Sequence, residues 1–161
     1  MEPLRRVALL GAIVVCCVNC DQATKTVATA QLAGRPPISL VGDTIRFSYA
    51  ETPGGFLSLG VSLPGRIRAW VFGLLPAVAV LTLLAVAVRL HSPNRLQLVA
   101  VSLLIAGGTA NIIDRVTYGV VRDFLNIGIG SVRTGVFNVA DFAITVSTVL
   151  LMADFWTGRV R

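Results

Sequence analysis

The sequence has little charge, few aromatic residues and almost no histidine. Charged residues make up 14% of its 161 residues and aromatic residues 7%, whereas soluble domains carry roughly 25% charged residues. Hydrophobic residues reach 55%, and the mean hydropathy is +0.79. This composition excludes an ordinary water-soluble domain. Basic and aromatic residues are not interleaved in the way that is typical of nucleic-acid-binding proteins. We therefore attribute the net charge of +6 to membrane anchoring.

The single histidine excludes several classes of enzyme. A serine or cysteine nucleophile normally needs a positioned base, and His91 lies in a short polar link with no candidate partner. A metalloprotease of the His-Glu-x-x-His type needs two histidines. Cys16, Cys17 and Cys20 share one apolar segment, and their spacing is not a metal-binding pattern. We therefore expect no metal and no cofactor.

Four segments are hydrophobic enough to cross a bilayer, which takes about 20 residues per helix. Three of them are Ala69–Val88, Leu96–Ile113 and Val136–Trp156, and the fourth, Val7–Cys20, extends to about Ala30. A lipoprotein signal has a small residue just before its cysteine, and none of the three cysteines here has one. We therefore expect the first helix to be retained and not cleaved. The sequence predicts an all-α membrane protein with one domain, residues 1–161, and helices at about 7–30, 69–88, 96–113 and 136–156.

Two segments between the helices have the pattern of strands. Thr44–Ala50 alternates polar and apolar residues, the period of a half-buried strand, and a second strand-like run lies between Asp114 and Gly135. We expect a small β-sheet at the membrane surface, with Asp123 in an outer loop. Basic residues near helix ends predict cytoplasmic termini and an extracytoplasmic sheet, although more basic residues in total lie on the sheet side.

Two aspartates, Asp123 and Asp141, lie at the edges of hydrophobic segments. Ionisable groups at membrane depth are costly and usually mark function. Two neighbouring carboxylates cannot both ionise easily. The ionised one can deprotonate water, and the protonated one can polarise a carbonyl and protonate the leaving amine. This is the chemistry of an aspartic protease.

Other polar residues lie at helical spacings. Asn138 precedes Asp141 by three residues, and Asp21 and Lys25 are spaced i,i+4 with the acid first, which favours an ion pair. Asn111 and Asp114 form an i,i+3 pair beside Arg115. An aspartate next to an arginine is more often structural than catalytic.

Three motifs in order resemble the signal peptidase II (lipoprotein signal peptidase) family, and the similarity covers nearly the whole chain. The motifs are Asp21-Gln22-Ala23-Thr24-Lys25, Gly107-x-x-x-Asn111-x-x-Asp114-Arg115-x-x-x-Gly119-x-Val121-x-Asp123-Phe124, and Phe137-Asn138-x-Ala140-Asp141. The resemblance implies an intramembrane aspartic endopeptidase of the bacterial cytoplasmic (inner) membrane. Such an enzyme cleaves diacylglyceryl-modified prolipoproteins on the amino side of the lipidated cysteine, at the extracytoplasmic face. Prolipoproteins, membrane lipids and globomycin-type peptide inhibitors are the implied partners.

The resemblance also implies roles for single residues. Asp123 and Asp141 match the catalytic pair. The residues expected to bind substrate or frame the pocket are Asp21, Lys25, Asn111, Arg115, Asn138, Thr52 and Gly54, and those expected to be structural are Asp114, Gly107 and Ala140. The family usually has Asn-x-Gly-Ala and an aromatic residue in the first outer loop. Here Thr52-Pro53-Gly54-Gly55-Phe56 stands there, with Thr52 in place of the asparagine.

Two alternatives come from other functional classes. A small carrier or channel could relay protons through Asp141 and Asp123, because intramembrane acids also mark such pathways. Against it, the second and third hydrophobic segments carry no charge across their depth. A scaffold subunit could use the same acids only to pair with Arg115 and Lys25. Substitution of both acids by asparagine separates these hypotheses, because a scaffold predicts no loss of cleavage.

Overall fold

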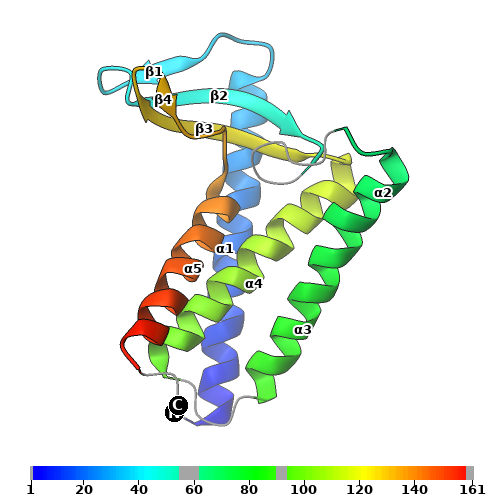
Figure 1. Ribbon diagram of the computed structural model, residues 1–161, viewed down its shortest axis with the longest axis vertical. Coiled ribbons are helices and arrows are strands. Elements are labelled where there is room, and N and C mark those ends of the chain that lie inside the picture. Colours follow the sequence, from blue (N-terminus) through cyan, green and yellow to red (C-terminus); the bar gives the residue numbers. More distant parts are fainter. Residues whose placement is uncertain (1, 55–61, 90–93, 159–161) are drawn as a thin grey trace.

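The computed structural model describes residues 2–54, 62–89 and 94–158, so His91, Gly55 and Phe56 lie outside the described residues. Long helices stand side by side, and a small sheet lies across one end of the bundle (Figure 1). The elements in chain order are α1 (Pro3–Leu32), β1 (Ile38–Leu40), β2 (Ile45–Thr52), α2 (Gly65–Ala69), η2 (Trp70–Leu74), α3 (Leu75–Arg89), α4 (Arg95–Tyr118), β3 (Val121–Ile129), β4 (Val132–Arg133) and α5 (Val139–Trp156).

Within the described residues, four helical segments are long and apolar enough to cross a membrane, as the sequence predicts. The second segment joins α2, the π-helical turn η2 and α3 into one rod. Its π-helical turn ends two residues before Pro76, whose ring removes a helical hydrogen bond. Large apolar side chains such as Leu75, Leu81 and Val149 are exposed on the outer surface of the bundle, which is where lipid would contact a membrane protein.

Helix α4 packs closely against α5 because Gly107 has no side chain. A Cβ atom on Gly107 would lie 2.5 Å from the carbonyl oxygen of Ala140 and 2.7 Å from Cγ1 of Ile144. Both distances are shorter than real Cβ contacts, so only glycine fits without a shift of the two helices. Ala110 and Ala140 are also fully buried. This expected structural role of Gly107 and Ala140 brings the end of α4 near the start of α5.

The sheet is antiparallel with strand order β1-β2-β3-β4. In the register of β2 with β3, Ala50 lies opposite Asp123, next to an irregularity between Phe47 and Ala50. The sheet packs on the end of α1 through Phe124, which forms a small apolar cluster with Ala28 and Leu32. The predicted strand at Thr44–Ala50 corresponds to β2. Helix α1 begins, and helix α5 ends, at the end of the bundle that lies opposite the sheet (Figure 1).

Two local expectations are wrong. Asp114 and Arg115 belong to α4, not to a loop, because α4 continues to Tyr118 and ends at Gly119 with φ 76°. Hydropathy falls after Ile113, but the charges that follow are satisfied by other elements, so the backbone stays helical. Asp123 lies in β3, not in an outer loop. Asp141 lies in the first turn of α5, at the edge of its hydrophobic segment.

Candidate active site

Asn138 connects the two carboxylates of the expected catalytic pair. It is the N-cap of α5, where its Oδ1 accepts a hydrogen bond from the Asp141 backbone N–H at 2.9 Å. Its own backbone N–H donates to Asp141 Oδ2 at 3.3 Å, the reciprocal pattern of a capping box. The Asn138 Nδ2 group donates to Asp123 Oδ1 at 2.7 Å. One buried amide side chain therefore joins β3 to the start of α5 and holds both aspartates.

A second amide fixes Asp141 from α4. Asn111 Nδ2 donates to Asp141 Oδ1 at 2.8 Å, and Asn111 Oδ1 accepts hydrogen bonds from Lys25 Nζ at 3.0 Å and Asn138 Nδ2 at 3.2 Å. These partners fix the orientation of the Asn111 amide, because its oxygen faces the donors and its nitrogen faces the carboxylate. The Asp141 carboxylate is thus held by two asparagines while its side chain stays partly exposed.

Thr52 contacts the other aspartate directly. Its hydroxyl donates to Asp123 Oδ2 at 2.6 Å. Two residues on, the Gly54 carbonyl accepts a hydrogen bond from Arg115 Nη2 at 3.1 Å, and the guanidinium interacts with the charges of Asp141 and Asp123. The end of β2 and the residues that follow it are therefore bonded to the site at both Thr52 and Gly54.

The environment of Asp123 favours its protonated form. Burial, with the charge of Asp141 in support, raises the pKa of Asp123 to about 6, although hydrogen bonds from Thr52 and Asn138 act in the opposite direction. The side chain is only 4% exposed. Near or below pH 6 the pair can therefore hold one proton between two carboxylates, the state that acid–base chemistry by such a pair needs.

A fully buried ion network lies beside the pair. Lys25 Nζ contacts Asp21 at 2.7 Å and Asp114 at 3.2 Å, so the predicted i,i+4 ion pair is confirmed. The Asp21 Oδ1 atom accepts a hydrogen bond from the Ala140 backbone N–H at 2.8 Å, which adds an anion at the N-terminus of α5. Because Asp21 and Lys25 have no exposed surface, their placement favours support of the site over contact with a substrate.

Sequence reasoning missed two members of this network, Arg122 and Gln22. Asp114 pairs with Arg122 Nη2 at 2.8 Å as well as with Lys25, whereas Arg115 was the neighbour expected from the sequence. Gln22 Nε2 also donates to Asp114 Oδ1 at 3.0 Å. The available signal was the alternation of side chains along a strand, which directs Arg122 and Asp123 to opposite faces.

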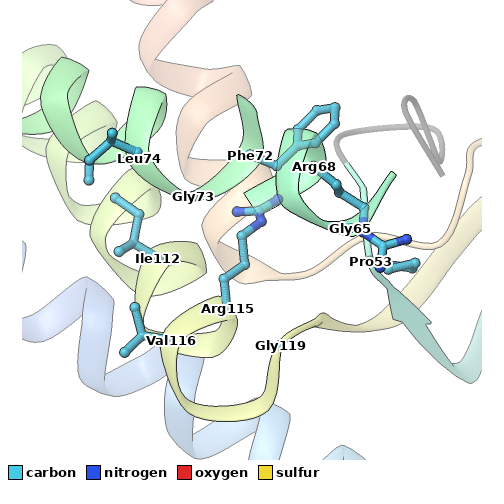
Figure 2. A pocket seen from close by; sticks show the side chains of 11 residues that line it. Pro53, Gly65, Arg68, Phe72, Gly73, Leu74, Ile112, Arg115, Val116 and Gly119 are labelled. Atoms are coloured by element: carbon cyan, nitrogen blue, oxygen red, sulfur yellow. The ribbon is translucent and has the colours of Figure 1, made fainter. Parts of the chain in front are cut away.

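A pocket of about 480 Å³ adjoins the site between the α2–η2–α3 rod and α4. Figure 2 shows Arg115 on α4 with Arg68 and Phe72 across from it. Pro53 lines the same pocket and directly follows Thr52, whose hydroxyl bonds Asp123. The pocket therefore adjoins the residue that contacts Asp123. Within the described residues, no group of three or more histidine, cysteine or acidic side chains could hold a metal ion.

Comparison with known proteins identifies relatives along most of the chain. Residues 13–157 match the family described as Signal peptidase (SPase) II. The lipoprotein signal peptidase of Parasynechococcus marenigrum (strain WH8102) is 35% identical over 156 residues, which are 97% of this chain and 93% of the relative. That of Bifidobacterium longum (strain NCC 2705) is 34% identical over 160 residues, 96% of this chain and 81% of the relative.

Two solved structures have a similar fold. One is a bacterial membrane enzyme determined by the in meso method at 1.9 Å, with a TM-score of 0.77, 25% identity, and coverage of 92% of this chain and 93% of that chain. The other, determined by the same method at 2.3 Å, has a TM-score of 0.81, 24% identity, and coverage of 96% and 91%. Together with the four apolar helices of the described residues, the first of these structures supports a multi-pass membrane protein.

Proposed function

The chain belongs to the signal peptidase II family, and from this premise we propose that it is an aspartic endopeptidase that removes the signal peptide from diacylglyceryl-modified prolipoproteins. The observation that carries the aspartic mechanism is the contact of one buried asparagine, Asn138, with both Asp123 and Asp141. Cleavage would occur on the amino side of the lipidated cysteine.

The proposed chemistry uses the two carboxylates in different protonation states. Asp141 is the more exposed member and, when ionised, would take a proton from the attacking water. Asp123, whose pKa is about 6 because of burial, would donate a hydrogen bond to the scissile carbonyl. As the tetrahedral intermediate collapses, a proton passes to the nitrogen of the leaving cysteine. The two groups would titrate as a pair.

The surroundings of the pair suit a substrate that is partly in the membrane. The 480 Å³ pocket brings Phe72 and Ile112 together with Arg115, so apolar and polar parts of one molecule could be bound side by side. Arg115 and the Gly54 carbonyl meet at its edge, where the peptide next to the scissile bond would lie. A globomycin-type peptide would compete for this same region.

The proposed location is the bacterial cytoplasmic (inner) membrane, with both termini cytoplasmic. In support, the start of α1, the end of α3, the start of α4 and the end of α5 lie at the end of the bundle opposite the sheet (Figure 1). This end carries Arg5, Arg6, Arg89 and Arg95, basic residues near helix ends that are expected on the cytoplasmic side. The sheet and the catalytic pair would then lie at the extracytoplasmic face, where water has access to the carboxylates.

The function is tested with two forms of one substrate. We expect the purified protein in detergent to cleave a diacylglyceryl-modified prolipoprotein and to leave the same precursor without its lipid uncut, as followed by a shift in gel mobility. The physical reason is that only the modified form retains apolar chains for the membrane-facing pocket. Equal cleavage of both forms would contradict the proposed substrate class. No cleavage by a folded protein would contradict the function itself.

Thr52→Val is expected to move the alkaline limb of the pH profile of kcat/KM to higher pH by about one unit. The Thr52 hydroxyl stabilises ionised Asp123, so its loss raises the pKa further above 6, and the pair keeps its proton at higher pH. The matched control is Thr82→Val, because the Thr82 hydroxyl donates only to the Val78 carbonyl in α3. A limb that is unchanged, or that moves to lower pH, would contradict the role of Thr52.

A further inference from the structure

Arg122 is adjacent to Asp123 in β3 but contacts a different set of residues. Its guanidinium donates through Nη2 to Asp114 Oδ1 at 2.8 Å and to Gln22 Oε1 at 3.0 Å, and through Nε to Asp114 Oδ2 at 3.3 Å. It also lies over the Tyr118 ring, 4.1 Å from the centroid. The side chain is 5% exposed. Within the described residues, its hydrogen bonds go to Asp114 and Gln22 and not to either carboxylate of the expected catalytic pair, so it would act through the backbone.

The backbone of Arg122 is held at both of its polar groups. Its N–H donates to Asp114 Oδ2 at 2.9 Å, and its carbonyl oxygen accepts from Asn138 Nδ2 at 3.4 Å. The same Asn138 amide donates to Asp123. One residue of β3 is therefore fixed to α4 on one side and to the N-cap of α5 on the other, immediately before the catalytic position.

The charges of the cluster balance only when Arg122 is present. Lys25 and Arg122 face Asp21 and Asp114, two cations against two anions, and all four side chains are buried. Without the guanidinium, Lys25 alone would serve both carboxylates, and a net negative charge would remain in the interior. Such uncompensated burial is costly, so the elements that meet here would shift to admit water.

We propose that Arg122 is a positioning residue, which fixes the backbone of β3 on α1 and α4 so that the Asp123 carboxylate meets Asn138 and Asp141. The inference rests on the proposed peptidase function. It predicts a loss in the rate of the chemical step, because small displacements of a reacting group lower rate strongly. Substrate binding is affected little, since Arg122 is absent from the lining of the pocket beside Arg115.

The test compares Arg122→Gln and Arg122→Lys with the full-length protein in detergent, using cleavage of the modified prolipoprotein. We expect Arg122→Gln to lower kcat by about 10- to 100-fold with KM changed by less than about threefold. Arg122→Lys should recover part of kcat, because an ammonium keeps the charge but cannot bind both Asp114 oxygens and Gln22 as the planar guanidinium does. A melting temperature above the assay temperature for each variant establishes that folded protein is compared.

Arg133→Gln is the matched control. Arg133 is also an arginine of the sheet, with a side chain 11% exposed. It bonds Asn126 and the Asp43 carbonyl, partners that lie in the sheet region and not in α1 or α4. The Arg133→Gln variant should retain the kcat of the wild type. A kcat of Arg122→Gln within twofold of wild type, or a loss matched by Arg133→Gln, would overturn the inference while wild-type cleavage upholds the function.

If Arg122→Gln does not fold, Arg122→Lys decides alone: wild-type kcat in a folded lysine variant contradicts a need for the guanidinium geometry, and a reduced kcat at unchanged KM supports it. An inactive wild type would overturn the proposed function and this inference together.

Discussion

Replacing either Asp123 or Asp141 by asparagine is expected to lower kcat by about 10²- to 10⁴-fold, to the limit of detection in a gel assay. An amide cannot take a proton from water, and it cannot deliver one to the leaving amine. Asn138 donates to both carboxylates, to Asp123 through its side-chain amide and to Asp141 through its backbone N–H. Each variant therefore leaves one carboxylate without the partner that sets its protonation state. The measurement is the mobility shift of a diacylglyceryl-modified prolipoprotein incubated with wild type and with each variant.

The control for this pair is Asp43→Asn. Asp43 is an aspartate of the sheet region that bonds Ser39 and Arg46, and Arg46 together with Ser39 holds its pKa below the usual range. Its neutralisation should leave cleavage unchanged. Cleavage that survives in Asp123→Asn or Asp141→Asn would assign that acid a structural role. Proton flux through vesicles containing an inactive wild type would favour the carrier hypothesis.

The stability of Asp123→Asn distinguishes lost chemistry from lost folding. The pKa of Asp123 rises from its ordinary value to about 6 on folding, so the folded protein binds more protons than the unfolded chain between about pH 4 and pH 6. Wild-type stability therefore falls as pH rises through that window. Asp123→Asn lacks this cost, so it should be more stable than wild type at pH 8 by up to about 3 kcal/mol, and of similar stability at pH 4.

Lys25→Met is expected to destabilise the fold by about 3 to 5 kcal/mol. Lys25 is fully buried and contacts Asp21 at 2.7 Å, Asp114 at 3.2 Å and Asn111 Oδ1 at 3.0 Å. Methionine has a similar volume but no charge, so the lost interactions are electrostatic. Two buried carboxylates would then share Arg122 as their remaining cation within the described network. The decrease is measured by thermal or denaturant unfolding in detergent.

An exposed ion pair provides the comparison for Lys25→Met. Arg46→Met removes the ion pair between Arg46 and Asp43, whose two side chains are each 39% exposed. It should change stability far less than Lys25→Met, because solvent screens an exposed pair. Any folded Lys25→Met should also cleave more slowly, because Asn111 loses a donor that orients its amide toward Asp141. A Lys25→Met variant as stable as wild type would show that this ion network does not stabilise the fold.

The candidate site was partly predictable from local spacing. The i,i+4 relation of Asp21 and Lys25 predicts a shared helix face, and the structure contains that ion pair. The three-residue spacing of Asn138 and Asp141 is the spacing of a capping box, which the structure also contains. Both features are set within a single turn of helix. For that reason the sequence alone was sufficient for them.

The partners of Asp114 and the approach of Asp123 to the start of α5 were not predictable in this way. Asp114 meets Arg122 because β3 folds back on α4 after the left-handed turn at Gly119, and no local spacing records that approach. The extension of α4 past Ile113 has the same cause, since its polar end is stabilised by residues of α1 and β3.

The sequence by itself determined the four helices long and apolar enough to cross a membrane, and the small sheet. Hydrophobic length and side-chain periodicity are local properties, so they can be taken from the chain. Tertiary structure decided that Asn138 at the start of α5 also bonds Asp123 of β3, and that Lys25 of α1 and Arg122 of β3 both pair with Asp114 of α4. Those contacts join residues from separate helices and strands, and they exist only because burial forces each charge to find a partner.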